Sequence, residues 1–244
     1  AGQASARRFA RWLGAKDVIA NEDSGVLHEV EKVYALMRRL PGKRIEQPIP
    51  PCQVIPDAVR VEALRKNLAL PLDSGGRLRV GLHISARKPS QRWPAGCFVE
   101  FAHRLTAHCP VEFLLFWSPG DENDPRHPGD DRKAAEILRG VTDLPVHAVP
   151  TSTLPELIAG LSLCDYMVQS DGGAMHLAAA LGKPIVCFFG HSDARRWHPW
   201  AVPYELLQPK NEDVATLTAS EVFDAFLRLQ AKANALGSSD RCVS

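Results

Sequence analysis

The chain has 244 residues, of which 45% are hydrophobic and 23% charged, and its formal net charge is +1. These values are typical of a globular protein with one large or two small domains, and the charge gives no indication of nucleic acid binding. No apolar run approaches the roughly 18 residues of a membrane-spanning helix. The opening residues 1–5 carry no apolar segment of a signal peptide, so we expect a cytoplasmic protein.

The six cysteines are scattered along the chain, and none forms a C-x-x-C pair. Four of them fall in or beside apolar stretches and are expected to be buried thiols: Cys97, Cys109, Cys164 and Cys187. This pattern indicates a reducing compartment, with neither disulfides nor a zinc site. No Asp-x-Asp motif stands beside the loops discussed below, so no bound metal or other cofactor is expected.

The first part of the chain has a mixed pattern of short elements. A helix is predicted over Ala6–Leu13, where arginines surround an apolar side. Such a helix suits peripheral contact with an anionic membrane, or docking on a sheet with its charges solvated. A short strand is predicted over Asp17–Ala20, and a helix capped by Ser24 over Ser24–Leu40. Asp57 is expected to cap a further helix.

Beyond a Pro-, Ser- and Gly-containing linker at Leu70–Arg77, strand and helix patterns alternate regularly. The predicted strands are Leu78–Ile84, Val111–Trp117, Pro145–Val149, Tyr166–Gln169, Ile185–Phe189 and Tyr204–Leu207. The predicted helices follow Pro94, surround Ala134–Leu138, follow the Thr153-x-x-Glu156 capping box, follow Gly173, and cover Ala219–Leu236.

This alternation predicts an α/β fold with a parallel, Rossmann-like sheet covered by helices on both faces. Ligands of such sheets bind at the carboxyl ends of the strands, so the loops that follow the strands are the candidate site. We divide the chain into residues 1–75, a sheet domain at residues 76–218, and a terminal helix and tail at residues 219–244.

The turn after the fourth predicted strand of the sheet carries the clearest chemistry. Gly172 and Gly173 let a ligand approach the backbone, and the first amides of the following helix suit a phosphate. Asp171 can cap those amides or accept from a sugar hydroxyl, and the ring of His176 can reach a phosphate oxygen at the helix start. The alternative is a structural turn with a capping Asp and a structural His.

The loop after the first strand of the sheet combines a hydroxyl with several cations, which suits a pyrophosphate. Its candidate residues are Ser85, Arg87, Lys88 and Arg92. The alternative is a solvated basic loop without a ligand.

The stretch Asp171-Gly172-Gly173-x-x-His176-Leu-Ala-Ala-Ala-Leu-Gly-x-Pro184, with the apolar strand after it, resembles the donor-site motif of glycosyltransferase family 9. This family contains the ADP-heptose:lipopolysaccharide heptosyltransferases. His83-Ile84-Ser85-Ala86-Arg87 with Arg92-Trp93-Pro94 is similar to its first donor loop, and Gly190-His191-Ser192-Asp193 to a later one. The resemblance implies a GT-B fold, in which residues 1–75 are the later, incomplete part of a first α/β domain.

The resemblance also implies roles for individual residues. Glu122 is expected to hold nucleoside hydroxyls, Ser152 to pass near the base, and Gly190 and Ser192 to contact the donor. The family carries a lysine where this chain has Gln91, so Arg92 or Lys88 would have to neutralise the diphosphate instead. The general base is expected in the missing part of the first domain and has no candidate here.

A basic and aromatic cluster follows the last of these loops, at Arg195, Arg196, Trp197, His198 and Trp200. It suits sugar faces or phosphates through stacking and charge, and it equally suits a surface between domains.

The resemblance implies a cytoplasmic glycosyltransferase, peripheral to the inner membrane, that moves a sugar with inversion to a lipopolysaccharide core acceptor. The expected donor is a nucleotide-diphosphate sugar, ADP-heptose first, and nucleic acid is not an expected partner. One alternative is a nucleotide-binding module without transferase activity. Another is a sugar-nucleotide epimerase, which would turn over the donor without an acceptor.

Overall fold

The structure is a computed structural model of the chain, and it describes residues 8, 10–14, 28–39, 48–124 and 128–239. Internal contacts divide the chain into two compact units. Unit 1 comprises Ala1–Pro50 and Arg195–His198, and unit 2 comprises Pro51–Ala194 and Pro199–Ser244. The division at residues 75/76 and 218/219 made from the sequence stays a prediction.

The main element of unit 1 is helix α2, Glu29–Met37. It begins later than predicted because His28, not Ser24, is its N-cap: His28 Nδ1 accepts from the amide of Val30 at 3.2 Å. The carboxylate of Glu31 returns to the His28 amide at 2.9 Å, which completes a capping box. Imidazole is an uncommon cap, so the sequence pattern favoured the serine.

Two other predictions for unit 1 fall on residues that are only partly described. Within Ala6–Leu13, residues 8 and 10–12 are helical. The strand predicted at Asp17–Ala20 lies outside the described residues.

Unit 2 is built on a parallel sheet of six strands in the order β3-β2-β1-β4-β5-β6. The strands are β1 Leu78–His83, β2 Val111–Trp117, β3 Val146–Pro150, β4 Tyr166–Ser170, β5 Ile185–Phe188 and β6 Tyr204–Leu207. All six predicted strands are therefore confirmed, each to within one residue at either end.

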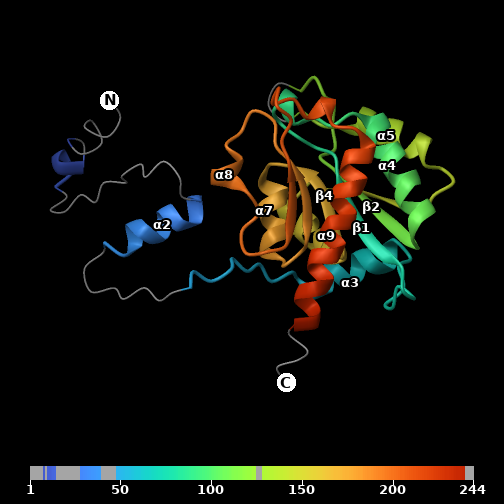
Figure 1. Cartoon of the computed structure of the whole chain (residues 1–244), viewed down its shortest axis with the longest axis horizontal. Helices are drawn as coiled ribbons and strands as arrows, with labels where there is room; N and C mark the ends of the chain where they lie inside the picture. The colour runs from blue at the N-terminus through green and yellow to red at the C-terminus, as the bar shows by residue number, and fades with distance from the viewer. Residues whose placement is uncertain (1–7, 9, 15–27, 40–47, 125–127, 240–244) are drawn as a thin grey trace. The chain divides into compact units, whose positions relative to one another are not determined.

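Helices cover both faces of this sheet. They are α3 Ala58–Asn67, α4 Ala95–His108, α5 Asp131–Gly140, α6 Leu154–Ser162, α7 Gly173–Ala180 and α9 Ala219–Ser239. Unit 2 also has the 3₁₀ turns η1 Pro89–Gln91 and η2 Val214–Thr216, whereas all but the first residue of the short α8, Ala194–Trp197, belong to unit 1. One core lies between the sheet and α4, α5 and α9, and the other between the sheet and α3, α6 and α7. In Figure 1, α9 crosses in front of the strands and α7 lies behind them.

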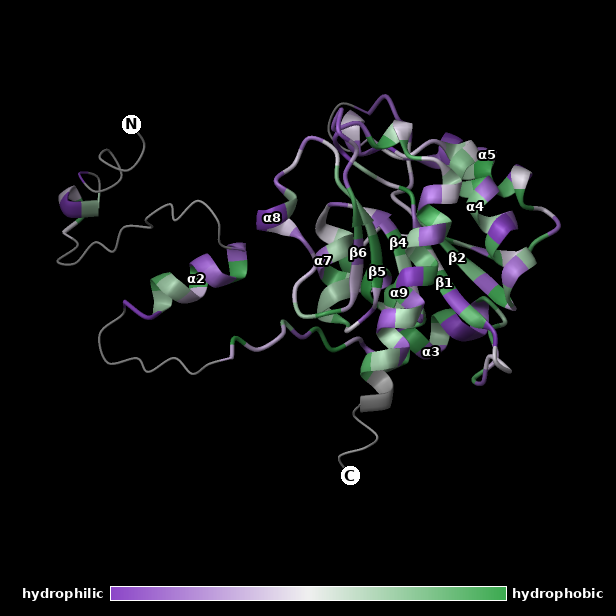
Figure 2. Cartoon of the chain, in the orientation of Figure 1, coloured by the Kyte–Doolittle hydropathy of each residue, from purple (hydrophilic) through white to green (hydrophobic). Residues whose placement is uncertain are grey.

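The two-sided cover explains why the strands read as apolar runs rather than as alternating patterns. All seven residues of β2 are buried, and so are all four of β5. Strand β5 is coloured as hydrophobic along its length in Figure 2, whereas β4 becomes hydrophilic toward its carboxyl end and the helices carry hydrophilic stripes.

Side-chain caps and turns set several helix ends as the sequence predicts. Asp57 accepts from the amide of Val59 at the start of α3, and Thr153 and Glu156 form the capping box of α6. Gly182 has φ +73°, the left-handed conformation expected just after α7.

The cysteine predictions are confirmed in part. Cys164 and Cys187 are buried, but Cys97 and Cys109 are half-buried and Cys52 is exposed. Burial raises the pKa of Cys164 to about 12, so this thiol stays protonated.

Among the described residues, no helix combines the length and the apolar character needed to cross a membrane.

Candidate functional site

A hollow of about 390 Å³ opens at the carboxyl ends of β1 and β4. These neighbouring strands are where the strand order reverses, because β1 leads to β2 on one side and β4 leads to β5 on the other. Ligands of doubly wound sheets bind in the crevice at this position. The hollow, called here the β1–β4 hollow, is lined by His83, Ser85, Ala86, Arg87, Lys88, Gln91, Ser170, Asp171, Gly172, Gly173 and Ala174.

The amino end of α7 faces the β1–β4 hollow without a side-chain cap. Gly172 is the N-cap residue, and no side chain caps this helix among the residues that the structure describes. A Cβ at Gly172 or Gly173 would meet nothing within 4 Å, so open space lies over this backbone. The first amides of a helix carry partial positive charge, and here they border a hollow large enough for a phosphate.

Asp171 does not cap α7, although the sequence allowed that role. Its Oδ2 accepts a hydrogen bond of 2.7 Å from Nε2 of Gln91. Its own amide donates to the carbonyl of Phe188 at 2.8 Å, which ties the turn to the end of β5. The carboxylate is therefore held toward the loop that follows β1, called here the β1 loop.

Gln91 connects three of the loops that follow the strands. Its side chain is 4% exposed, and besides Asp171 its Nε2 donates to Oγ of Ser192 at 3.0 Å. Its carbonyl accepts from Oγ of Ser170 at 2.5 Å. Gln91 thus contacts the loops after both β4 and β5.

Two cations of the β1 loop stand at the rim of the hollow. Arg87 and Lys88 are both exposed and line it. Nζ of Lys88 lies 3.0 Å from Oγ of Ser192, the same oxygen that accepts the hydrogen bond from Gln91. Ser85 lines the hollow as well, and its Oγ accepts from the amide of Ser118 at 2.9 Å. Charge at the rim is thus net positive, with Asp171 the one carboxylate among the lining residues.

The floor of the hollow is polar but neutral. His83 ends β1, and burial, together with the nearby cation of Lys133, lowers the pKa of its imidazole to about 4. Lys133 donates from Nζ to the carbonyl of Ile84 at 2.9 Å and so fixes the end of the strand. Gln169 lies beside His83 in register on β4 and is fully buried.

The loop after β5 packs tightly against the β1 loop. A Cβ at Gly190 would lie 2.1 Å from the carbonyl oxygen of Ser90, so only glycine fits there. Nε2 of Gln208 donates to the carbonyls of Gly190 and Ser192, each at 3.0 Å. This packing places the Ser192 hydroxyl beside Lys88.

Six residues proposed from the sequence are not among those that line the hollow. Gly190 and Ser192 lie in the loop after β5 described above, and the other four are Arg92, His176, Glu122 and Ser152. The side chain of Arg92 turns back on its own loop, where Nε donates to the carbonyl of Ala86 at 3.0 Å. His176 is half-buried on α7, where burial lowers its pKa and the carboxylate of Asp171 partly offsets that effect.

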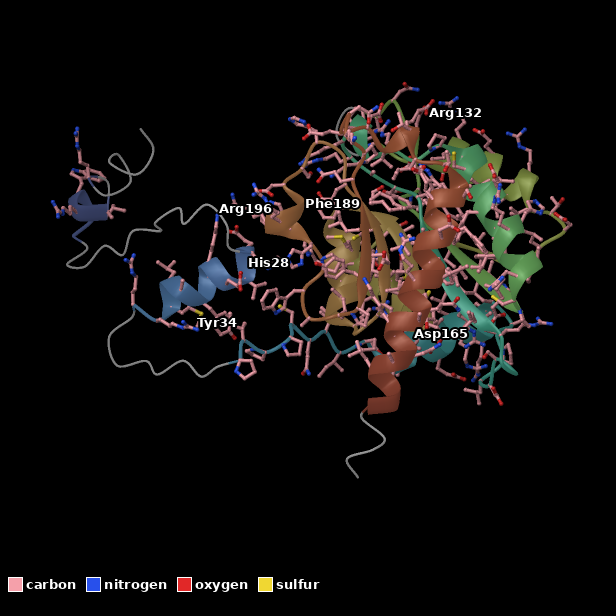
Figure 3. All side chains as sticks on the ribbon, in the orientation of Figure 1. His28, Tyr34, Arg132, Asp165, Phe189 and Arg196 are labelled. Atoms are coloured by element: carbon pink, nitrogen blue, oxygen red, sulfur yellow. The ribbon has the colours of Figure 1, made fainter. Side chains whose placement is uncertain are left out.

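The other two lie near the ends of β2 and β3. Glu122 pairs with Arg132 at 2.6 Å on the outside of the molecule, where Figure 3 shows Arg132 pointing away from the sheet. The amide of Ser152 donates to Oε2 of Glu156 at 2.9 Å, so this amide is occupied within the α6 cap. The roles in ligand binding of all the residues proposed from the sequence, whether or not they line the hollow, stay predictions.

Sequence reasoning left His83, Lys133 and Gln208 out of the site. His83 had a usable signal, since it is a polar residue at the end of a buried strand, directly before the candidate loop. Lys133 and Gln208 are far from that loop in sequence, and their contacts are made to backbone carbonyls. Residue types alone give no indication of such contacts.

In unit 1, part of the basic and aromatic cluster contacts α2. Nε of Arg196 donates to Oε2 of Glu29 at 2.5 Å, and Nε2 of His28 lies 2.8 Å from the carbonyl of His198 (Figure 3). Within unit 1 these contacts indicate a structural use of the cluster. Across the described part of the chain, no group of three or more His, Cys, Asp and Glu side chains is arranged to hold a metal ion.

Comparisons with known proteins agree on one family. The family model of glycosyltransferase family 9 (heptosyltransferase) matches residues 2–225. The lipopolysaccharide heptosyltransferase 3 of Escherichia coli is 27% identical over 139 residues, which are 56% of this chain and 38% of that protein. The lipooligosaccharide heptosyltransferase 2 of Haemophilus influenzae is 25% identical over 141 residues, 57% of this chain and 39% of that protein. The matched part thus spans less than two fifths of these curated relatives.

Solved structures show the same fold. The E. coli ADP-heptose lps heptosyltransferase II superposes with a TM-score of 0.72 at 22% identity, covering 93% of this chain and 69% of that one. The E. coli heptosyltransferase WaaC with ADP gives 0.64 at 18% identity, covering 88% of this chain and 59% of that one.

Proposed function

The chain belongs to glycosyltransferase family 9, and from this premise we propose that its β1–β4 hollow binds the diphosphate of a nucleotide sugar. The proposed reaction transfers a heptose from ADP-heptose to a hydroxyl of a lipopolysaccharide core, with inversion at the anomeric carbon. The observation that carries the proposal is the uncapped amino end of α7, which faces a hollow with cations at its rim.

The lining groups match the charge that develops during such a transfer. When the sugar leaves, negative charge grows on the diphosphate, and the amides at the start of α7 together with Lys88 and Arg87 are arranged to stabilise it. The neutral imidazole of His83 adds a hydrogen-bonding group at the floor. Asp171, Ser192 and Gly190 are proposed to complete the donor site.

The rival proposal is a nucleotide-binding module that does not transfer sugar. It is favoured by one observation: Asp171 is the sole carboxylate lining the hollow in the described part of the chain, and Gln91 already binds it. A transferase needs a base for the acceptor proton, and this site supplies no other candidate.

The deciding experiment incubates the chain with ADP-heptose, with and without a lipopolysaccharide core acceptor. If the chain is a transferase, ADP is released only when the acceptor is present, and the mass of the acceptor increases by one heptosyl unit. Binding of ADP without either product would establish the binding module instead. Turnover of the donor without acceptor would indicate an epimerase or a hydrolase.

The place of action also stays a proposal. We propose a cytoplasmic protein that meets its acceptor at a membrane surface. Co-sedimentation of the chain with vesicles that contain the acceptor, compared with vesicles that lack it, tests this directly.

A further inference from the structure

We infer that Gln91 is a positioning residue that keeps the carboxylate of Asp171 away from the amino end of α7, so that the helix amides remain open to an anionic ligand. The inference rests on the proposed function for the identity of that ligand. It assigns a purpose to an amide side chain that connects the three loops around the hollow.

Without the hydrogen bond from Gln91, the carboxylate of Asp171 could turn toward the amino end of α7. Asp171 directly precedes Gly172, the N-cap residue of α7. Carboxylates are favoured at helix amino ends, both as hydrogen-bond acceptors and through the helix dipole. Gly172 has no side chain to take that role, so Asp171 is the nearest side-chain acceptor in the sequence.

Gln91 prevents this by holding the carboxylate from a buried, fixed position. Its Nε2 has two hydrogens, and these are donated to Oδ2 of Asp171 at 2.7 Å and to Oγ of Ser192 at 3.0 Å. The side chain is 4% exposed, and the bond from Ser170 to its carbonyl fixes its backbone. An anchored, buried amide therefore fixes the direction of the carboxylate.

The side chain of Gln91 is neutral and is not placed to act on the ligand itself. With both hydrogens engaged, the Gln91 amide has no donor left for a ligand, and it carries no charge to neutralise a phosphate. The exposed ammonium of Lys88 lines the hollow and hydrogen bonds the same Ser192 hydroxyl, so it supplies a cation for that task. Gln91 therefore acts through Asp171, whereas Lys88 is placed to act on the ligand.

The test measures binding of inorganic pyrophosphate by titration calorimetry. This probe has no sugar or base, so Asp171 cannot contribute through a sugar hydroxyl. Gln91→Met keeps the size of the buried side chain but removes the donors, and it should weaken binding about tenfold as the carboxylate moves to the helix end. Adding Asp171→Ala to it should restore affinity to within about twofold of Asp171→Ala alone.

A purely structural role for Gln91 predicts a different pattern, because loop damage would persist in the double variant. Unchanged affinity in Gln91→Met, or a loss that Asp171→Ala fails to rescue, would overturn the inference. If Gln91→Met does not fold, Gln91→Leu, which also lacks the amide donors, must show the same loss and the same rescue.

The outcomes also separate this inference from the proposed function. If Asp171→Ala restores pyrophosphate binding to Gln91→Met but the chain transfers no sugar, the inference stands and the transferase proposal is wrong. Sugar transfer without rescue would remove the inference alone. Failure of the unchanged chain to bind pyrophosphate would overturn the inference outright.

Discussion

Around the β1–β4 hollow, charged side chains lie at the rim and a neutral side chain lies at the floor. Arg87 and Lys88 are exposed at the rim, whereas His83 at the floor is held neutral by burial. This division suits a ligand with a charged end and a polar, uncharged end. It also has a consequence for stability that depends on pH.

The pKa of His83 in the folded chain, about 4, lies below its ordinary value of 6.5. The unfolded chain therefore binds a proton first as pH falls, and stability is lost between pH 6.5 and about 4. Urea unfolding of the wild type and of His83→Gln across this window measures the effect. The wild type should lose more unfolding free energy than the variant, since the carboxylates titrate in both chains. Parallel curves would show that His83 is not held neutral.

At the scale of elements, short helices with defined ends place the site. Helix α7 has only eight residues, and its position depends on the turn at Gly172 and on the left-handed stop at Gly182. Most of its stability must come from packing on the sheet rather than from helix propensity. Its ends are therefore sensitive to backbone changes.

Two glycine substitutions should act with opposite signs. Gly182→Ala places a side chain at φ +73°, where it is strained although nothing crowds it, and should lower stability by about 1 kcal/mol. Gly96→Ala lies in the first turn of α4 in open space at an ordinary helical φ, and should raise stability by about 0.5 kcal/mol. Chemical denaturation of both variants measures this. A gain at Gly182, or equal effects at both positions, would contradict the assignment of the left-handed stop.

At the scale of the whole molecule, the reversal of strand order between β1 and β4 places the site. The sequence predicts the parallel sheet and a site in the loops at the strand ends, because buried parallel strands read as apolar runs and polar turns follow them. It does not predict the strand order, which the structure supplies. It could not predict that Gln91 contacts Asp171, eighty positions away, or that Arg92 turns from the hollow. Those outcomes depend on how loops pack against each other, which no local pattern encodes. The late start of α2 at His28 was missed for a local reason, the uncommon choice of cap.

The central claim is that the first amides of α7 bind a diphosphate, and one calorimetric comparison with ADP tests it most directly. Gly173 is the first residue of α7, where proline fits a helix but lacks the amide hydrogen. Gly173→Ala keeps the amide and adds only a methyl group in open space. We predict that Gly173→Ala binds ADP nearly as the wild type does, and that Gly173→Pro binds at least about tenfold more weakly. Equal affinity of the alanine and proline variants would contradict the account.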